Sequence, residues 1–339
     1  MNITIIGAGA WGTALATSLA SHHSVTLWAR HAANIKAMRS TNLNQRYLPD
    51  ILLPANLEFS SDFDAALAKA ELVIIALPTA ALRSTLQKLA QSARFLSAGL
   101  SPEFGVVLAC KGFEAESSKL PHQVVDEVLP PGCRYGVLSG PSFAQEVARG
   151  LPTALTLASV DEEFARHTAK ALHHARLRIY ASNDVIGVEV GGAVKNVLAI
   201  ASGICDGMGL GQNARAALLS RGLAEITRLG LKLGGRIETL AGLSGLGDLI
   251  LTCTGDLSRN RQVGLQLAQQ HDLPEILRRL KHVAEGVYTA REVHHLAQRL
   301  GVTMPISEAV YRILYEDIPA VEMVVELLNR TPNPEFGGD

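Results

Sequence analysis

The part of this sequence that most restricts its fold is a glycine-rich turn near the N-terminus, in "ITIIGAGAWGTALA" (residues 3–16). An apolar run ends at Ile6, and Gly7, Gly9 and Gly12 follow with the spacing G-x-G-x-x-G at the start of a helical pattern. In such a strand–turn–helix unit, the first glycine permits a tight turn, the second lets the backbone approach a pyrophosphate, and the third lets the helix pack closely. The helix N-terminus adds N–H groups and a positive dipole end. The spacing predicts a dinucleotide site, and the alternative is a purely structural glycine turn.

The end of the expected second strand bears on which dinucleotide is bound. In "SVTLWARH" (24–31) the strand ends in Arg30 and His31. An acidic residue at this point would bind the ribose 2′-hydroxyl of NAD, whereas the planar guanidinium of arginine pairs well with a 2′-phosphate. The sequence therefore favours NADP(H), alone or together with NAD(H). The alternative is a solvated arginine at a strand end.

The first half of the chain alternates short apolar runs with helical patterns, which is typical of a parallel sheet with helices packed on it. The predicted strands cover residues 3–6, 25–28, 72–76, 106–109, 136–138, 154–157 and 178–180. Helices are expected between them at 13–21, 34–40, 63–70, 82–90, 122–129 and 164–175. Residues 42–57 contain no such pattern and are predicted to form one long irregular connection, of a length that is often functional.

Strand-like runs stop near residue 184, and the patterns that follow are helical, at 185–204, 213–233, 258–270, 287–300 and 305–315. We therefore predict an α/β N-terminal Rossmann-type domain with a mostly parallel sheet, followed by an all-α C-terminal domain. The boundaries that we expect are 1–184 for the dinucleotide-binding domain, 185–330 for the helical substrate and catalytic domain, and 331–339 for a frayed polar tail.

Composition excludes several classes of partner. The 31 basic and 32 acidic residues give a net charge of −1, so the chain has no excess of basic residues that would favour binding to nucleic acid or to an anionic membrane. Cys110, Cys133, Cys205 and Cys253 lie far apart without metal-ligand spacing, which indicates reduced thiols, a cytoplasmic location and no metal. The three His-His pairs (22–23, 173–174 and 294–295) are interpreted as surface residues. The uncharged stretch 1–29 lacks a basic leader and is broken by glycines, so we expect neither a signal peptide nor a membrane span.

One lysine stands out in the helical half. Lys195 lies in the apolar, small-residue run "VGGAVKNVLAIASGI" (190–204), and no acidic residue shares its face of the expected helix. Lysine is almost never fully buried without a partner. Lys195 is either a residue that extends along the helix flank into water, or a catalytic ammonium whose partners come from elsewhere in the chain.

Polar residues also follow the strands and open later helices. Ligands of open α/β sheets bind beyond the carboxyl ends of the strands, where this chain has Lys111, and Gly140 with Ser142, which we expect at a helix N-cap. In the helical half, Asp248 lies among apolar neighbours, where a carboxylate needs a partner. The run 258–260 is predicted to open a helix and to form an anion site, because an arginine follows the capping serine. The alternative for this run is an ordinary N-cap with a solvated arginine.

Taken together, these motifs resemble those of the bacterial type of NAD(P)-dependent glycerol-3-phosphate dehydrogenase. The resemblance runs in order from residue 3 to about 318 through "GAGAWGTALA", "NQRYLP", "CKGFE", "SGPSFAQEV", "GGAVKNVLAIASGI", "GLSGLGDLILTCTGDLSRNR" and "EGVYTA". It implies a Rossmann domain with an all-helical domain, paired as a homodimer. The implied reaction is the reversible reduction of dihydroxyacetone phosphate to sn-glycerol 3-phosphate, which feeds glycerophospholipid synthesis.

The resemblance also implies a role for each matching residue. Lys195 would be the general acid and base, with Lys111 and Asp248 in the same polar cluster. The substrate would be held by these three and by Gly140, Ser142, Ser258, Arg259 and Asn260. The cofactor would contact Gly7, Gly9, Ala10, Trp11, Gly12, Arg30, His31, Tyr47, Lys111, Ala144, Arg259, Val283 and Glu285. Ala10 stands where relatives often carry serine, which removes a possible hydroxyl contact with the pyrophosphate. The small residues around Lys195 would let substrate and nicotinamide pack against its helix.

Two other functions compete with this one. Another nicotinamide-dependent hydroxyacid or phosphosugar-acid dehydrogenase would have a similar two-domain plan, but typically carries asparagine one turn after the lysine, where this chain has Ala199. A non-catalytic NADPH-binding sensor would need the glycine turn but neither lysine nor the 258–260 anion site.

Overall fold

The computed structural model describes residues 1–280 and 284–331. The chain divides into two compact units. The first unit contains residues 1–111 and 120–185, and the second contains residues 112–119 and the chain from Ile186 onward. The short segment 112–119 thus packs with the helical unit, although the residues on both sides of it belong to the first. Most of the tail 331–339 and the cofactor candidate Val283 lie outside the described residues.

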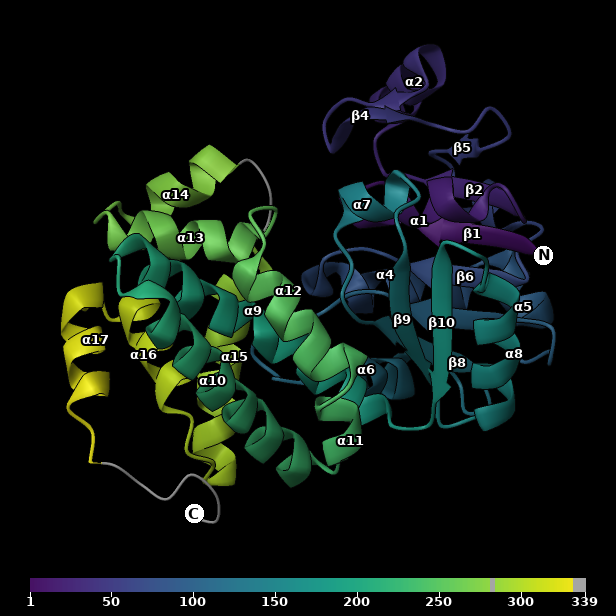
Figure 1. The fold of residues 1–339 in the computed structure, drawn as a ribbon. Coiled ribbons are helices and arrows are strands. Elements are labelled where there is room, and N and C mark those ends of the chain that lie inside the picture. Colours follow the sequence, from purple (N-terminus) through teal and green to yellow (C-terminus); the bar gives the residue numbers. More distant parts are fainter. Residues whose placement is uncertain (281–283, 332–339) are drawn as a thin grey trace. The chain divides into compact units, whose positions relative to one another are not determined.

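An eight-stranded sheet forms the core of the first unit (Figure 1), in the order β10-β9-β8-β7-β6-β1-β2-β5. Only the β8–β9 pair is antiparallel among these described strands. The strands are β1 (Asn2–Ile6), β2 (Ser24–Trp28), β5 (Glu58–Ser60), β6 (Leu72–Ile75), β7 (Gly105–Leu108), β8 (Tyr135–Ser139), β9 (Thr153–Ala158) and β10 (Leu177–Ser182). The predicted mostly parallel Rossmann-type sheet is confirmed, and β5 is the sheet strand that the sequence analysis missed.

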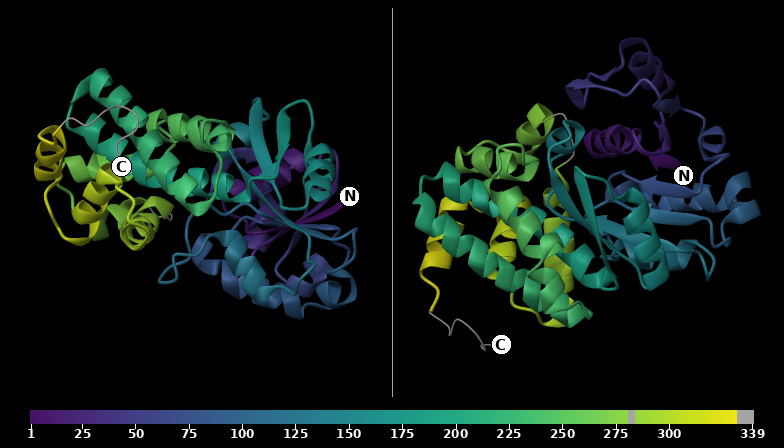
Figure 2. Two further views of the ribbon diagram at one scale, coloured as in Figure 1. Left: turned by 90° about the horizontal axis from the view of Figure 1, so that it is seen from below. Right: turned by 45° about the vertical axis from the view of Figure 1, so that its right-hand side comes forward.

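The order in which the chain adds strands to the sheet reverses at β1. The chain moves from β1 to β2 on one side and later returns to β6 on the other side of β1. Right-handed crossovers then place the two groups of connecting helices on opposite faces of the sheet, as the two views of Figure 2 show. These helices are α1 (Ala10–Leu19), α2 (Ala32–Thr41), α3 (Phe63–Leu67), α4 (Leu82–Gln91), α5 (Ala93–Ala98), α6 (Pro121–Val128), α7 (Ala144–Ala148) and α8 (Glu162–Leu172), with the 3₁₀ turn η1 (Thr79–Ala81). Ligands of such sheets bind at the reversal point, beyond the strand carboxyl ends.

The connection 42–57 is not irregular throughout, which corrects the prediction. It contains β3 (Leu43–Asn44) and β4 (Leu48–Leu52), which form a separate antiparallel pair. Leu48 and Ile51 are buried in a small apolar cluster with Ala14 of α1 and Val147 of α7. Because β3 has only two residues and the buried residues of β4 pack on the distant helices α1 and α7, no local alternation marks the pair.

From α9 onward the described part of the second unit is helical, as the sequence predicts. Its helices are α9 (Val185–Gly207), α10 (Gly211–Leu233), α11 (Ile237–Leu240), α12 (Asp248–Thr254), α13 (Arg259–Ala268), α14 (Leu273–Leu280), α15 (Glu285–Leu300), α16 (Pro305–Tyr315) and α17 (Ala320–Leu328), with the π-helical turn η2 (Leu243–Gly247). The first residue of α9, Val185, still belongs to the first unit. The short helices α11, α12 and α14, and also α17, were not predicted from the sequence. Helix α9 has the length and apolar composition of a membrane span, but 94% of its most apolar stretch is buried in the folded chain, as expected of a core helix.

Candidate active site

The three glycines of the N-terminal turn occupy three different environments. Gly7 has φ +118°, a conformation that a side chain strongly disfavours. A Cβ atom on Gly12 would lie 1.9 Å from the Gly7 carbonyl oxygen, so only glycine allows α1 to lie this close to the turn. A Cβ atom on Gly9 would meet no atom within 4 Å, so the backbone there faces open space. This geometry matches the three roles of a pyrophosphate-binding turn.

Three of the expected cofactor residues lie next to this turn. Ala10 and Trp11 begin α1, Ala144 begins α7, and all three pack against the small apolar cluster of Leu48 and its neighbours. The indole Nε1–H of Trp11 is buried and has no hydrogen-bond acceptor within the described residues. An N–H group of this kind is costly unless a ligand satisfies it, so these residues fit a bound dinucleotide.

A residue that the sequence analysis did not identify fixes the turn. The Asn44 side chain is buried, and its Nδ2 donates to the Ala8 carbonyl oxygen at 3.0 Å and to Thr13 Oγ1 at 2.8 Å. Asn44 therefore connects β3 to both sides of the glycine turn. The motif "NQRYLP" contains this residue, but only the fold shows its contact with the turn.

The remaining cofactor candidates of the first unit are at least partly exposed. Arg30 and His31 follow β2, both are exposed, and the Arg30 Nε donates to His31 Nε2 at 3.4 Å. His31 is also the N-cap residue of α2. Tyr47 lies between β3 and β4, with the Arg46 guanidinium 5.3 Å from its ring centroid.

The carboxyl ends of β7 and β8 bring together three expected substrate residues. Lys111 Nζ donates to the Gly140 carbonyl oxygen at 3.1 Å, and Ser142 Oγ donates to the same oxygen at 2.9 Å. Gly140 has φ +135°. The prediction that Ser142 is a helix N-cap is wrong, because Phe143 holds that position before α7. The Ser142 hydroxyl instead donates to the Gly140 carbonyl oxygen, which directs it away from the helix.

In the second unit, Lys195 is buried and pairs with Asp248. The two side chains are 8% and 1% exposed, and Lys195 Nζ donates to Asp248 Oδ1. Nζ also donates to Thr252 Oγ1 at 2.9 Å, and Thr252 Oγ1 in turn donates to the Asp248 carbonyl oxygen at 2.6 Å. The surface alternative for Lys195 is therefore wrong. Its carboxylate partner comes from α12, and Thr252, one turn further along α12, is a contact that the sequence analysis missed.

The small residues of α9 have a structural cause. A Cβ atom on Gly191 would lie 2.5 Å from the Ser244 carbonyl oxygen, and one on Gly203 would lie 2.0 Å from that of Arg261. From the other side, a Cβ atom on Gly264 would lie 2.0 Å from the Ile200 carbonyl oxygen. Close backbone packing against η2 and α13 thus requires glycine here, whereas the sequence analysis attributed the small residues to substrate and nicotinamide.

Helix α13 begins as predicted. Ser258 is its N-cap, and Ser258 Oγ accepts a hydrogen bond from Arg261 N at 3.2 Å. Arg259 is exposed in the first turn. Asn260 is buried, and its Nδ2 donates to Asn196 Oδ1 at 2.9 Å. The run 258–260 is therefore linked to the residue that follows Lys195.

The same asparagine reaches a third helix. Asn260 Oδ1 accepts from Gly286 N at 3.0 Å, next to the cofactor candidate Glu285 at the start of α15. The starts of α13 and α15 are thus joined to the middle of α9. In this unit the structure brings together the lysine, its carboxylate and the helix start that was expected to bind an anion.

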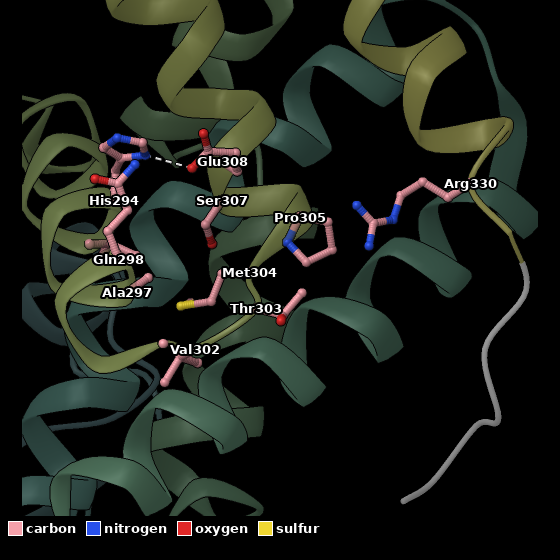
Figure 3. Close-up of a pocket in the computed structure, with 12 residues that line it drawn as sticks. His294, Ala297, Gln298, Val302, Thr303, Met304, Pro305, Ser307, Glu308 and Arg330 are labelled. Atoms are coloured by element: carbon pink, nitrogen blue, oxygen red, sulfur yellow. Dashed lines mark hydrogen bonds and ion pairs between the residues drawn. The ribbon is translucent and has the colours of Figure 1, made fainter. Parts of the chain in front are cut away.

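Other titratable groups of this unit have different roles. Burial raises the pKa of the Cys253 thiol to about 12, so it is protonated at neutral pH and is no nucleophile. His294 is buried and its Nδ1 is 2.5 Å from Glu308 Oε2, which corrects its assignment to the surface. Both side chains line a pocket of about 390 Å³ beside the C-terminal half of α15, with the His294 ring directed toward Glu308 (Figure 3). None of the residues expected to bind cofactor or substrate lines this pocket.

Comparison with known proteins covers both units. Residues 2–165 match the family described as NAD-dependent glycerol-3-phosphate dehydrogenase N-terminus, and residues 184–325 match the corresponding C-terminus. The chain is 59% identical to glycerol-3-phosphate dehydrogenase [NAD(P)+] of Thiobacillus denitrificans over 336 residues, which are 99% of this chain and 100% of the relative. It is 56% identical to the protein of the same name from Nitrosomonas eutropha, over 99% of each chain.

A solved structure shows the same fold. The crystal structure of glycerol-3-phosphate dehydrogenase from Coxiella burnetii superposes with a TM-score of 0.91 at 42% identity, covering 97% of this chain and 99% of that one. The matches extend over the glycine turn, the Lys195–Asp248 pair and the start of α13. The chain therefore belongs to the family of NAD-dependent glycerol-3-phosphate dehydrogenases.

Proposed function

We propose that this chain catalyses the reversible reduction of dihydroxyacetone phosphate to sn-glycerol 3-phosphate, with NADPH or NADH as hydride donor. The relatives carry the name of this activity. The observation that carries the proposal is the buried pair of Lys195 and Asp248, in the same helical unit as an N-capped helix start with an exposed arginine. A cofactor-binding sensor would have no need of this pair.

Lys195 is the proposed general acid in the direction of reduction. The nicotinamide, when bound, supplies a hydride to the carbonyl carbon of the substrate. As the carbonyl π electrons move to oxygen, Lys195 Nζ donates a proton to that oxygen and so gives the alcohol. In the reverse direction the neutral amine removes this proton. Asp248 and Thr252 hold Nζ in place and stabilise its charged form.

Lys111 is proposed to act on the same substrate oxygen. Its ammonium would stabilise the negative charge that develops during hydride transfer, without giving up its own proton. Lys111 Nζ already donates to the Gly140 carbonyl oxygen, which fixes one of its directions. Gly140 and Ser142 would complete this group of substrate contacts.

The substrate phosphate is proposed to bind at the start of α13. Ser258 caps the helix, the first-turn N–H groups and the dipole favour an anion, and the guanidinium of Arg259 adds a charged fork. Asn260 is held by Asn196 and Gly286, so it is fixed before any substrate arrives. A site fixed in this way loses little conformational entropy on binding.

The residues of the first unit fit a dinucleotide. The open space at Gly9 and the buried Trp11 N–H without an acceptor are the two features that such a ligand would use. Arg30 is proposed to pair with the 2′-phosphate of NADP(H), with NAD(H) as a second cofactor. Val283 and Glu285 are proposed as further cofactor contacts, and no metal takes part.

The cellular setting is part of the same proposal. We expect a homodimer, as the family resemblance implies, and a cytoplasmic location, which the four dispersed cysteines favour. The near-zero net charge and the burial of the long apolar helix α9 support the absence of nucleic-acid binding and membrane insertion. The product of the proposed reaction would feed glycerophospholipid synthesis. The proposed domain division is residues 1–184 for the cofactor and 185–330 for substrate and catalysis.

The test compares two substrates in two proteins. Arg259→Ala should lower kcat/KM for dihydroxyacetone phosphate about 10- to 100-fold, since a charge-assisted hydrogen bond contributes about 1.5–3 kcal/mol. For unphosphorylated dihydroxyacetone, which lacks the phosphate, kcat/KM should be nearly the same in Arg259→Ala and in the wild type. The measurement is NAD(P)H absorbance with each substrate. Equal losses for both substrates would refute the phosphate role of Arg259, and an inactive wild-type protein would refute the proposed reaction.

A further inference from the structure

The segment Gly112–Lys119 follows Lys111 directly and leads into α6. It has no regular secondary structure, yet it is well held. Glu114 N donates to the Lys119 carbonyl oxygen at 2.8 Å, and Ser118 N donates to that of Glu114 at 3.0 Å. Glu116 and Ser118 have φ +66° and +52°, in the left-handed region that other residues than glycine seldom adopt. Such conformations persist where surrounding contacts impose them.

The contact that imposes them comes from α15. The Glu292 carboxylate is buried, its Oε2 accepts from Ser118 Oγ at 2.7 Å, and its Oε1 accepts from Glu116 N at 3.3 Å. These are the two non-glycine residues of the segment with positive φ. A buried carboxylate is costly unless it is hydrogen-bonded, so the carboxylate and the segment stabilise each other.

Helix α15 also carries the expected site residues of the second unit. Glu285 begins it, and the Gly286 N–H holds Asn260. Glu292 lies seven residues after Glu285, or about two helical turns, so both lie on the same face of α15. His294, two residues further, lies on a different face, toward the pocket described above.

From these contacts we propose that Glu292 is a positioning residue for Lys111. The Cα atoms of residues 111 and 112 are about 3.8 Å apart along the chain, so whatever fixes the segment limits where the Lys111 backbone can lie. Strand β7 precedes Lys111 in the chain, and the segment that Glu292 holds follows it directly. Glu292 acts on the reaction only through this segment. The kinetic part of its test rests on the proposed function.

Two adjacent serines provide a matched pair of variants. Ser118→Ala removes the hydroxyl that Glu292 accepts from. Ser117→Ala removes a hydroxyl whose two hydrogen bonds both lie within the segment: it donates to Glu114 Oε2 at 2.7 Å and accepts from Lys119 N at 3.3 Å, and neither bond reaches α15. We expect Ser118→Ala to lower kcat/KM for dihydroxyacetone phosphate about 10-fold through misplacement of Lys111, and Ser117→Ala to have little effect. Equal effects of the two variants would overturn the proposal.

Variants of Glu292 separate position from charge. Glu292→Ala removes both hydrogen bonds to the segment and should lower kcat/KM at least as much as Ser118→Ala, whereas Glu292→Gln keeps a carbonyl acceptor and should retain most of the activity. An equal loss in both variants would assign the effect to charge and overturn the proposal. In a Lys111→Ala background, Ser118→Ala should cost nothing more, because residues that act through one another are not additive. Additive losses would likewise overturn it, since a general loss of stability gives additive effects.

A second measurement does not depend on activity. Limiting acetylation of the folded chain, followed by peptide mass spectrometry, reports the reactivity of the Lys111 amine, with the exposed Lys36 as internal standard. Its reactivity relative to Lys36 should change in Ser118→Ala and Glu292→Ala but not in Ser117→Ala. Unchanged reactivity would overturn the positioning role even in an active enzyme. An inactive wild-type protein would refute only the proposed reaction, and the labelling would still decide the role of Glu292.

Discussion

Alanine at two glycines of the N-terminal turn should separate cofactor binding from folding. A Cβ atom at Gly12 would lie 1.9 Å from the Gly7 carbonyl oxygen, against the 3.0 Å below which real Cβ contacts essentially do not occur. Helix α1 would have to move by about 1 Å. Overpacking of this kind costs about 1–3 kcal/mol, more than the gain of about 1 kcal/mol from alanine in a helix. Gly12→Ala should therefore lower Tm and weaken cofactor binding together.

Gly9→Ala should behave differently. Gly9 has φ −75° and ψ −177°, which alanine adopts without strain, and its Cβ atom would meet nothing within 4 Å. Stability should change by no more than about 0.5 kcal/mol. The methyl group would nevertheless occupy the space through which a pyrophosphate reaches the backbone. Loss of one charge-assisted hydrogen bond, about 1.5–3 kcal/mol, should raise the Kd of NAD(P)H about 10- to 100-fold.

The assay is thermal unfolding together with titration of NAD(P)H fluorescence. Gly136→Ala on β8 is the control for stability alone, because its Cβ atom would lie 2.9 Å from the Ala158 carbonyl oxygen, away from the turn. It should lower Tm and leave the Kd unchanged. A wild-type Kd in Gly9→Ala would refute the pyrophosphate role, and a wild-type Tm in Gly12→Ala would refute the packing argument.

Three further predictions concern single side chains. Lys195→Ala should lower kcat about 10²- to 10⁴-fold, the usual contribution of a positioned acid or base, with the Kd of NAD(P)H nearly unchanged; near-normal turnover would exclude Lys195 as the acid. Arg30→Asp should weaken NADPH binding far more than NADH binding, because it replaces a phosphate partner by a repelling charge, and equal losses in titrations with both cofactors would exclude a contact with the 2′-phosphate. The pKa of Asp161 is lowered from its usual value, chiefly by the Phe164 N–H that its carboxylate accepts at the start of α8. Because the folded-state pKa is below that of the unfolded chain, the contribution of Asp161 to stability is present above the usual aspartate pKa and is lost as the pH falls through the folded value. Asparagine still caps a helix, so the free energy of unfolding of Asp161→Asn should approach that of the wild type in acid. A difference between the two proteins that is constant with pH would contradict this.

Local patterns predicted those features of the fold and site that local physics determines. The seven apolar runs became strands because a buried parallel sheet needs uninterrupted apolar residues. Lys195 was singled out because no partner was available on its own helix, and the partner is indeed a carboxylate of another helix. The roles of Gly7 and Gly12 followed from the spacing alone, and the structure gives the steric reason for each.

What could not be predicted depends on contacts between distant segments. The β3–β4 pair is short and is held by α1 and α7, so no alternation marks it. Asn44, Thr252 and Glu292 contact the glycine turn, Lys195 and the segment 112–119 from other parts of the chain, and in the sequence they look like ordinary polar residues. Ser142 was misassigned because a serine before a helical pattern resembles an N-cap, whereas its hydroxyl bonds to Gly140.

The assignment of residues 112–119 to the helical unit limits how modular this protein is. The chain passes from one unit to the other at residues 111–112, 119–120 and 185–186, so the helical unit is not encoded as one continuous piece. A fragment that begins near residue 185 would leave the buried Glu292 carboxylate without the Glu116 and Ser118 donors. Exchange of the helical unit between relatives would therefore require the segment 112–119 to be transferred with it. Recombination at residue 184 alone would combine the helical unit of one relative with the segment 112–119 of the other.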